Sequence, residues 1–215
     1  MAKAVICFDL DGTLADTLEA HFRSFNFAFQ KNNLPARSYP EIISKFGQPS
    51  EKIIMALFPK LSDRKLPEVA RDKIDFFTSS TFRLTKSIEG VAESLKKLRE
   101  KYAIALASNS THKEILLILK EAKIPAKIFD VIIGNGEFEP KPSPDAIKKV
   151  AKKSGARVEF IVGDTIYDVK AGKAAGVKTI AVLSGAGDIK ALGSEEPTMI
   201  IKSVAVLPEI LEGDL

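Results

Sequence analysis

The sequence of 215 residues has one cysteine and no long hydrophobic run. A single cysteine, Cys7, cannot form a disulfide within the chain, and this agrees with a reducing cytoplasm. No apolar run reaches the roughly 18 residues that a membrane-spanning helix needs, and the apolar stretch near the N-terminus is too short for a signal peptide. We therefore expect a cytoplasmic protein without a membrane partner.

The sequence also lacks the pattern of a nucleic-acid-binding protein. Its net charge is only +4, and its lysines cluster in KKLREK (residues 96–101) and KKVAKK (residues 148–153). Apolar residues at helical spacing accompany both clusters, and no aromatic residues are interleaved to stack on bases. We interpret the clusters as solvated helix faces and expect no nucleic-acid partner. The small positive excess is compatible with an anionic substrate.

From residue 85 onward, apolar β-branched runs alternate with amphipathic segments. The predicted strands cover residues 103–108, 129–133, 159–163, 178–183 and 198–201, and the predicted helices cover residues 90–101, 111–123, 143–153, 165–175 and 204–211. This alternation is typical of a parallel sheet covered by helices on both faces. We predict an α/β fold with a doubly wound, Rossmann-like parallel sheet that binds ligands at the carboxyl ends of its strands.

Residues 15–84 do not follow this alternation and are expected to form helices only. They separate the first predicted strand from the rest of the sheet, which indicates an inserted domain. The expected organisation is an α/β core domain of residues 1–14 and 85–215 and a helical cap domain of residues 15–84. His21 lies in the expected cap. A lone helix histidine without acidic or cysteine partners is more often structural than a ligand or a base, and we interpret it as structural.

The first predicted strand runs directly into two carboxylates in AVICFDLDGTL (residues 4–14). Asp9 and Asp11 are two residues apart, so their side chains would emerge on the same side of an extended chain. Two carboxylates held close together repel each other and raise the pKa of one, unless a cation intervenes. The stretch alone leaves three interpretations open: a divalent-metal site, an acid beside a nucleophile, or a strand-end turn in which Gly12 takes a positive φ.

Polar residues also follow the second predicted strand, in SNST (residues 108–111). Ser108 and its neighbours either bind an anion before the next helix or only cap that helix. Farther on, Lys141 lies in EPKPSPD (residues 139–145) with a proline on each side, directly before a predicted helix. A surface lysine needs no such rigid frame, which favours a functional role for Lys141.

The predicted strand at residues 159–163 also ends in an acid, in GDTIYD (residues 163–168). Asp164 is suited to cap the following helix, and Asp168 to interact with its N-terminal dipole. Capping does not explain why a second buried strand ends in a carboxylate. Because parallel strands bring their carboxyl ends to one edge of a sheet, Asp164 is expected near Asp9 and Asp11.

The combined residue types fit phosphoryl transfer. Carboxylate oxygens suit Mg²⁺, which would offset the crowding of the aspartates. A carboxylate can also attack phosphorus and form an aspartyl-phosphate. Alignment and charge neutralisation of the phosphoryl group, the main requirements of this chemistry, would come from Mg²⁺, Lys141 and Ser108.

The motifs DLDGT (residues 9–13), Ser108, Lys141 and GDTIYD (residues 163–168), in this order, resemble the four motifs of the haloacid dehalogenase (HAD) superfamily. The resemblance spans nearly the whole chain, including a helical cap inserted after the first strand. It implies that Asp9 is the nucleophile. Asp11 would protonate the leaving oxygen and then activate the hydrolytic water.

The resemblance also implies the remaining site residues. Ser108 and Lys141 would hold the phosphoryl group. The implied Mg²⁺ ligands are Asp9, Asp11 through its backbone carbonyl, Asp164, and Asp168 either as a ligand or as a support that pairs with Lys141. Further substrate contacts are implied for Leu10, Gly12 and Asn109.

The acid at position 11 separates the branches of the superfamily, because the dehalogenases lack it while phosphatases and phosphomutases have it. GDTIYDVKAGKAAGV (residues 163–177) and KPSPDAI (residues 141–147) resemble the phosphoglycolate-phosphatase-like branch. The cap segment SKFGQPSEKI (residues 44–53) is similar to a loop that family caps lower over the substrate. It contains four candidates for substrate specificity, Lys45, Phe46, Gly47 and Gln48.

The sequence thus predicts a Mg²⁺-dependent phosphatase, monomeric or homodimeric, that hydrolyses a small phosphate monoester through an aspartyl-phosphate. The ester is expected to be phosphoglycolate-like or a sugar phosphate. One alternative is a sugar phosphomutase of the same superfamily, although the arginine-rich cap loop of a β-phosphoglucomutase is not seen. A second alternative is a receiver-type phosphorylatable signalling domain, which has a different order of acidic residues and lacks an inserted cap.

Overall fold

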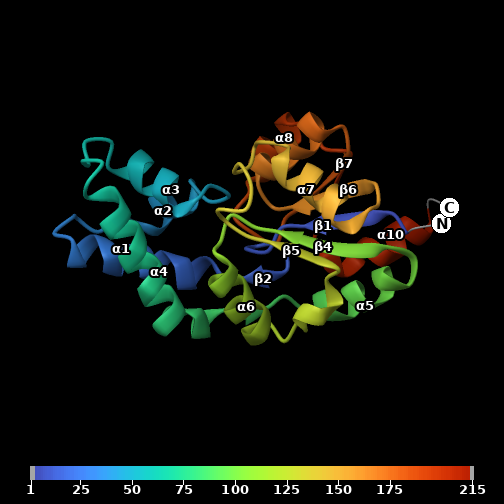
Figure 1. The fold of residues 1–215 in the computed structure, drawn as a ribbon, viewed down its shortest axis with the longest axis horizontal. Helices are drawn as coiled ribbons and strands as arrows, with labels where there is room; N and C mark the ends of the chain where they lie inside the picture. The colour runs from blue at the N-terminus through green and yellow to red at the C-terminus, as the bar shows by residue number, and fades with distance from the viewer. Residues whose placement is uncertain (1–2, 214–215) are drawn as a thin grey trace.

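The computed structural model describes residues 3–213 and contains a sheet of six parallel strands (Figure 1). The strand order is β5-β4-β1-β6-β7-β8. The strands are β1 (Val5–Phe8), β4 (Ala103–Ala107), β5 (Val131–Ile133), β6 (Val158–Gly163), β7 (Lys178–Val182) and β8 (Met199–Ile201). The predicted α/β fold with a doubly wound parallel sheet is confirmed.

Helices cover both faces of the sheet. They are α5 (Val91–Lys101), α6 (His112–Glu121), α7 (Asp145–Ser154), α8 (Ile166–Ala175), α9 (Ile189–Ser194) and α10 (Leu207–Gly213), with short 3₁₀ turns at Thr81–Leu84, Ala126–Ile128 and Val204–Val206. Figure 1 shows α7 and α8 on one side of the sheet and α5 and α6 on the other. The helix predicted at residues 143–153 begins two residues later, and the strand predicted at residues 129–133 is shorter at its start.

Strand β1 shows why the sequences of these strands are unbroken runs of apolar residues. Its even-numbered residues, Ile6 and Phe8, belong to an apolar cluster that includes residues of α5 and α6. Its odd-numbered residues, Val5 and Cys7, belong to a second cluster that includes residues of α7. Because side chains alternate between the faces of a strand, a sheet covered on both sides needs apolar residues at every position.

Helix α9 was not expected from the sequence. Its six residues contain Gly193 and carry too little periodicity to be recognised as a helix. The Asp188 side chain caps it by accepting hydrogen bonds from the backbone N–H groups of Lys190 and Ala191, at 2.9 and 3.1 Å. Local capping therefore stabilises a helix that the apolar pattern does not indicate.

Residues inserted after β1 form α1 (Leu18–Lys31), α2 (Tyr39–Ile43), α3 (Ser50–Leu57) and α4 (Leu66–Ser79). These helices lie beside the sheet in Figure 1, and we refer to them as the cap helices. They bury an apolar cluster of their own, which includes Phe25 and Phe29 of α1, Ile54 of α3 and Val69 of α4. The cap helices therefore do not depend on the sheet for all of their packing.

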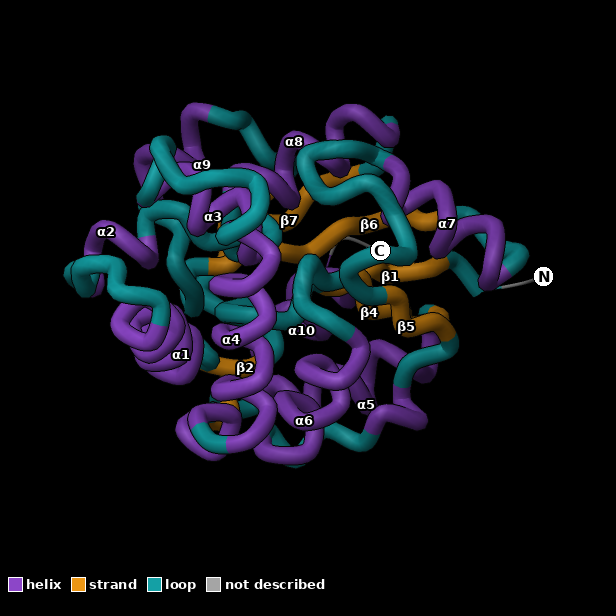
Figure 2. The backbone as a smooth tube through the Cα atoms, turned by 60° about the vertical axis from the view of Figure 1, so that its left-hand side comes forward, coloured by secondary structure: helices purple, strands orange, loops and turns teal. Residues whose placement is uncertain are grey.

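The expectation that residues 15–84 form helices only is wrong at their start. Strand β2 (Ala15–Asp16) pairs antiparallel with β3 (Lys86–Ser87), and the register places Ala15 opposite Ser87. The two chain segments that connect the sheet to the cap helices therefore run side by side; Figure 2 shows β2 near α1 and α4. Two-residue strands are too short to show a period-2 pattern, so the sequence gives no signal for them.

None of the helices in residues 3–213 combines the length and the apolar character that crossing a membrane requires.

Candidate active site

The parallel register brings three of the predicted site residues to one edge of the sheet. Phe8, the last residue of β1, pairs with Leu106 of β4 and Val162 of β6. Asp9, Ser108 and Asp164 follow these three strands, and the backbone N–H of Asp9 donates to the carbonyl oxygen of Val162 at 2.8 Å. These side chains therefore meet at the carboxyl ends of neighbouring strands, as expected for this sheet type.

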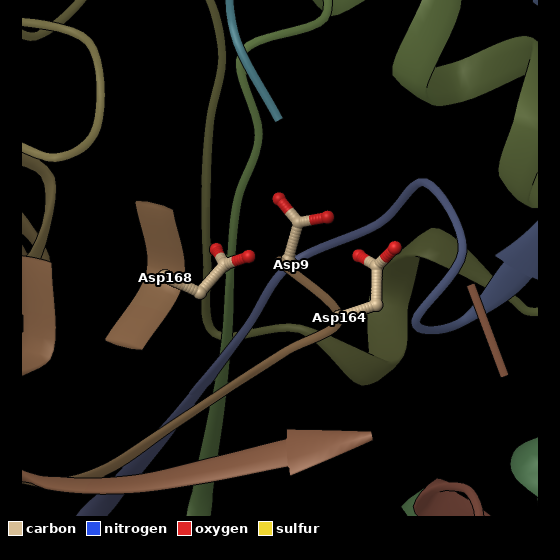
Figure 3. Close-up of side chains that lie close together, drawn as sticks. All are labelled: Asp9, Asp164 and Asp168. Carbon is tan, nitrogen blue, oxygen red and sulfur yellow. The ribbon is translucent and has the colours of Figure 1, made fainter. Parts of the chain in front are cut away.

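Three carboxylates lie side by side at this edge (Figure 3). Asp9, Asp164 and Asp168 each contribute an oxygen, and these oxygens lie within 4.8 Å of one another. Burial, followed by the negative charge of Asp168, raises the pKa of Asp164 to about 7. Burial also raises the pKa of Asp9, against the lowering effect of the Lys141 ammonium. The negative charge of the three carboxylates is therefore not fully offset by the Lys141 ammonium.

Lys141 pairs with two of these aspartates. Its Nζ donates to Oδ1 of Asp9 at 2.5 Å and to Oδ1 of Asp168 at 2.6 Å, and its side chain is 2% exposed. Burial alone would lower the pKa of Lys141, but Asp168 and Asp9 raise it above its ordinary value. The other oxygen of Asp168 accepts from the backbone N–H and the hydroxyl of Thr165, at 3.1 and 2.7 Å. Asp168 thus holds Lys141 against Asp9.

The Asp164 carboxylate is fixed by other parts of the chain. It accepts a hydrogen bond from the Thr13 hydroxyl at 3.2 Å and one from the Ala186 backbone N–H at 2.7 Å. Gly12, with φ of +80°, approaches so closely that a Cβ atom there would lie 2.5 Å from Oδ2 of Asp164, and a Cβ at Gly185 would clash with the same atom. Glycine is therefore required at both positions.

This donor set fits Mg²⁺. Carboxylate oxygens are the ligands that Mg²⁺ prefers, and a divalent cation would favour the ionised carboxylates against the burial and the repulsion that raise the pKa values of Asp9 and Asp164. Asp9 and Asp164 are the best placed ligands, since Asp168 already accepts a hydrogen bond from the Lys141 ammonium and two from Thr165, whereas Asp164 is not bound to any cation of the described chain. Among the described residues, the cluster of carboxylates does not include Asp11.

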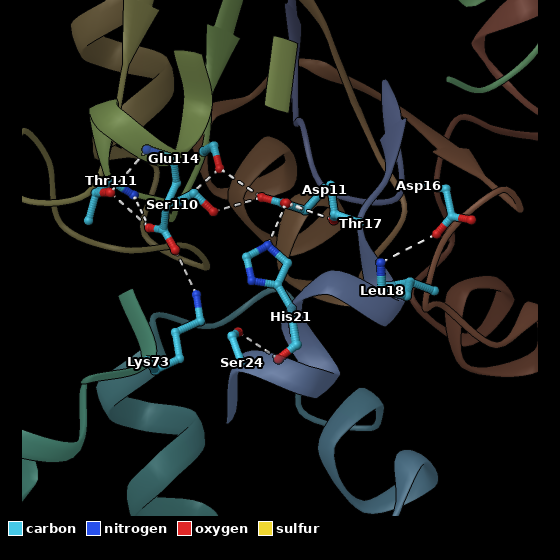
Figure 4. Close-up of polar contacts among 11 residues, drawn as sticks. Asp11, Asp16, Thr17, Leu18, His21, Ser24, Lys73, Ser110, Thr111 and Glu114 are labelled. Atoms are coloured by element: carbon cyan, nitrogen blue, oxygen red, sulfur yellow. Dashed lines mark hydrogen bonds and ion pairs between the residues drawn. The ribbon is translucent and has the colours of Figure 1, made fainter. Parts of the chain in front are cut away.

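The Asp11 carboxylate instead lies in a second network (Figure 4). Its Oδ1 accepts from the Thr17 hydroxyl at 2.8 Å and lies 2.9 Å from Nε2 of His21. Its Oδ2 accepts from the hydroxyls of Ser110 at 2.8 Å and Ser108 at 3.3 Å. Burial alone would raise the pKa of Asp11, but His21 and the hydrogen bonds from Thr17 and Ser110 hold it well below its usual range.

His21 was interpreted from the sequence as structural, and the structure places it against a predicted site residue. Its ring stacks on Phe77 of α4, with centroids 4.4 Å apart and an interplanar angle of 16°. The signal was the position of Thr17 and His21 on the first turns of a helix that begins seven residues after Asp11. Residues four apart share a helix face, but the sequence does not say which way that face points.

A buried ion pair connects the cap helices to the core. Nζ of Lys73, on α4, donates to Oε1 of Glu114, on α6, at 2.7 Å, and both side chains are 2% exposed. The other carboxylate oxygen of Glu114 accepts from the backbone N–H and hydroxyl of Thr111, at 2.9 and 2.8 Å. Burial would raise the pKa of Glu114, but Lys73, with further contributions from His21 and Thr111, lowers it. Thr111 is the N-cap of α6.

A pocket lies between the sheet edge and the cap helices. Its lining includes seven residues predicted from the sequence: Asp9, Asp11, Ser108, Asn109, Phe46, Gly47 and Gln48. The remaining lining residues are His21, Phe25, Ser50, Ile53, Lys73 and Ser110. The pocket holds about 50 Å³, several times the roughly 10–15 Å³ that one water molecule needs, which agrees with a small substrate.

Three predicted substrate contacts do not line this pocket. Leu10 is fully buried in the apolar cluster of the core. Gly12 packs against Asp164, and its carbonyl oxygen accepts a hydrogen bond from Ser184 at 2.8 Å. Lys45 is absent from the lining, although its backbone oxygen accepts from the Gln48 amide at 3.3 Å. The loop that carries Lys45 does reach the core, because Nδ2 of Asn109 donates to the Gly47 carbonyl oxygen at 2.7 Å.

Comparison with known proteins agrees with this geometry. Residues 6–182 match the family described as haloacid dehalogenase-like hydrolase. The chain belongs to this family. The resemblance of its four motifs to the superfamily is therefore confirmed.

Relatives along nearly the full length carry phosphatase names. The chain is 28% identical over 218 residues to the pyrophosphatase PpaX of Halalkalibacterium halodurans, covering 96% of this chain and 94% of that protein. It is 25% identical over 217 residues to a phosphoglycolate phosphatase of Vibrio vulnificus, covering 96% and 95%.

Solved structures of the family share the fold. A hydrolase from Pseudomonas syringae superposes with a TM-score of 0.87 at 22% identity, covering 98% of this chain and 99% of that one. A haloacid dehalogenase-like family protein from Streptococcus pneumoniae superposes with a TM-score of 0.85 at 21% identity, covering 99% of both chains.

Proposed function

We propose that this chain is a Mg²⁺-dependent phosphatase that hydrolyses a small phosphate monoester through an aspartyl-phosphate on Asp9. The main support is the separation of two carboxylates that are only two residues apart. Asp9 lies among Asp164, Asp168 and Lys141, while the Asp11 carboxylate is held by Thr17, Ser108, Ser110 and His21. One carboxylate is thus suited to attack and the other to transfer a proton.

In the proposed first step, Asp9 attacks the phosphorus atom and the bond to the leaving oxygen breaks. Lys141 and Ser108 bind phosphoryl oxygens, and Asp168 holds the Lys141 ammonium in place. Asp9 and Asp164 would hold Mg²⁺, which would supply neutralisation of the charge on the phosphoryl group. Asp11, as the general acid, takes up a proton when the anionic phosphate ester binds, because the bound negative charge opposes the lowering of its pKa by His21, Thr17 and Ser110. It gives this proton to the leaving alcohol.

In the proposed second step, Asp11 takes a proton from a water molecule, which attacks the aspartyl-phosphate and releases inorganic phosphate. Asp9 and the protonated Asp11 are regenerated for the next cycle. The hydrogen bonds from Thr17 and Ser110 keep the Asp11 carboxylate in one orientation through both steps. The cap helices limit the space for other water molecules around the site.

The names of the relatives support phosphatase activity on a small phosphate ester. The two substrate classes predicted from the sequence, phosphoglycolate-like esters and sugar phosphates, differ in whether the leaving group carries a second anionic group. A sugar phosphomutase remains the alternative within the family. Family membership gives no support to a receiver-type signalling domain. We further propose that the protein acts in the cytoplasm as a monomer or homodimer, which agrees with a single, buried cysteine.

The proposal is tested by measuring phosphate release from p-nitrophenyl phosphate. Release is expected with Mg²⁺, without any sugar bisphosphate as activator, and it should stop when EDTA removes the metal. A requirement for a bisphosphate would support the mutase, and one phosphorylation without turnover would support the receiver domain. Activity that persists in EDTA would contradict the role of Mg²⁺.

Metal binding can be tested without turnover. A ligand that binds only the folded state raises the melting temperature as its concentration increases. Mg²⁺ is expected to raise the melting temperature of the wild type but not of Asp164→Asn. Asp75→Asn, at an exposed position on α4, is the matched control and should respond as the wild type does.

A further inference from the structure

The basic groups around the pocket are already paired with carboxylates of the chain. Lys73 and His21 are the basic residues among the described lining residues. Lys73 is bound to Glu114 at 2.7 Å, and His21 lies 2.9 Å from Asp11. Behind the lining, Lys141 is shared between Asp9 and Asp168. No basic lining group within the described residues therefore has an uncompensated positive charge.

The Lys73–Glu114 pair carries the inference because it is not part of the proposed chemistry. Lys73 reaches the pocket from the cap helix α4, together with Phe25 of α1 and Ile53 of α3. Its Nζ lies 5.3 Å from the ring centroid of Phe25 and 5.1 Å from that of Phe77. In this apolar setting a charge is costly unless it is paired, and Glu114 provides the pairing.

Asn109 contributes a second, independent observation. Its Nδ2 donates to the Gly47 carbonyl oxygen, which can only accept, so the orientation of the amide is determined. Its Oδ1 is buried and has no hydrogen-bond partner among the described residues. Asn109 lines the pocket. A buried acceptor without a donor costs free energy. A ligand hydroxyl that reaches Oδ1 when the loop carrying Gly47 shifts would therefore be favoured.

We propose that the pocket selects phosphate esters with a small, uncharged, hydroxyl-bearing leaving group, such as a short polyol, over esters with a second anionic group. This specificity rests on the proposed phosphatase function. Glu114 is the determinant, since it neutralises Lys73 and prevents it from binding a carboxylate or a second phosphoryl group. Asn109 accepts a hydrogen bond from a leaving-group hydroxyl.

A second anionic group would meet two obstacles in this pocket. It would lose its hydration and find Lys73 already paired, so it would share the cation with the Glu114 carboxylate beside it. Like charges brought together in this way disfavour binding. A carboxylate or phosphate also has no proton to donate to Oδ1 of Asn109. An alcohol hydroxyl meets neither obstacle.

The first test compares glycerol 3-phosphate with 2-phosphoglycolate and pyrophosphate, using wild-type protein with Mg²⁺. The expected kcat/KM for glycerol 3-phosphate is at least about tenfold higher than for 2-phosphoglycolate or pyrophosphate, since a mismatched charge costs at least that factor. An equal or higher kcat/KM for 2-phosphoglycolate or for pyrophosphate would overturn the proposal. If no ester at all is hydrolysed, the proposed function fails instead, so the two failures are distinguishable.

The second test changes the charge at Glu114 and Lys73. Glu114→Gln leaves Lys73 free to bind an anion and should raise the ratio of kcat/KM for 2-phosphoglycolate to that for glycerol 3-phosphate by about tenfold. Lys73→Met leaves Glu114 unpaired and should lower the same ratio. The double variant Lys73→Met/Glu114→Gln has no net charge change and should keep the wild-type ratio.

A folding defect would reduce both rates together and leave their ratio unchanged, so the ratio reports specificity alone. The matched control is Glu212→Gln, which removes the same charge from an exposed Lys101–Glu212 pair at 3.6 Å, away from the pocket. It should leave the ratio unchanged. A ratio that does not move in Glu114→Gln, or moves equally in Glu212→Gln, would contradict the role of Glu114.

Discussion

His21 Nε2 lies 2.9 Å from Oδ1 of Asp11, although one residue belongs to a cap helix and the other follows a strand of the core. The proposed proton-transfer group is therefore oriented partly by the cap. Because His21 also stacks on Phe77 of α4, two cap helices determine its position. One of the contacts between the cap helices and the core is thus made through the carboxylate that the proposed chemistry needs.

Replacement of His21 should reduce turnover. In His21→Ala the Asp11 carboxylate loses one of its four partners, and kcat for p-nitrophenyl phosphate is expected to fall roughly 10- to 100-fold, since a well-placed acid–base group contributes at least this factor. His112→Ala is the matched control, because His112 is exposed. Equal kcat values for the two variants would show that the contact has no role in turnover.

Asp9→Asn should abolish phosphate release while the protein remains folded. An amide cannot form the acyl phosphate, so kcat is expected to fall by at least about a thousandfold. Lys141 keeps its contact with Asp168 in this variant, so the melting temperature should change little. Activity is measured by phosphate release and folding by circular dichroism. Substantial turnover in a folded variant would mean that another residue is the nucleophile.

Two residues of the same cap loop should behave differently. Gln48 lines the pocket, whereas Lys45 does not. Gln48→Ala is expected to raise KM for small phosphate esters severalfold, about the effect of losing one hydrogen bond. Lys45→Ala is expected to leave KM unchanged. A larger effect from Lys45→Ala would mean that the loop takes another position when substrate is bound.

Glu114 should make the stability of the protein sensitive to acid. Its pKa is lower in the folded state than in the unfolded chain, so it stabilises the fold above its unfolded value, roughly pH 4.3. This stabilisation is lost as the pH falls through the lower, folded pKa. Urea unfolding between pH 5 and pH 3 should show a weaker pH dependence in Glu114→Gln than in the wild type, and an identical slope would argue against the pair.

The fold and the grouping of the residues of the four motifs were predictable from the sequence. Both depend on local patterns and on the rule that parallel strands end at the same edge of a sheet. Asp9, Ser108 and Asp164 each follow an apolar run, and the carboxyl ends of parallel strands meet at one edge. Lys141 was indicated by its flanking prolines. These signals lie within a few residues of the side chain concerned.

The rest of the site depends on how the cap helices lie against the core, which no short segment specifies. His21 and Lys73 are separated by 52 positions, yet both contact the pocket. Their partners, Asp11 and Glu114, belong to the core. The same dependence explains why Lys45 was expected to contact substrate but does not line the pocket. Periodicity identifies a helix face but does not identify what it packs against.

The close approach of Gly12 and Gly185 to the Asp164 carboxylate has a consequence for natural variation. Neither glycine carries a functional group, and 173 positions separate them in the chain. A single methyl group at either one would displace the carboxylate proposed to bind the metal. The enzyme can therefore be inactivated by the smallest possible side-chain substitution at a residue that performs no chemistry. A variant that keeps every aspartate, serine and lysine of the four motifs would still carry a defective metal site.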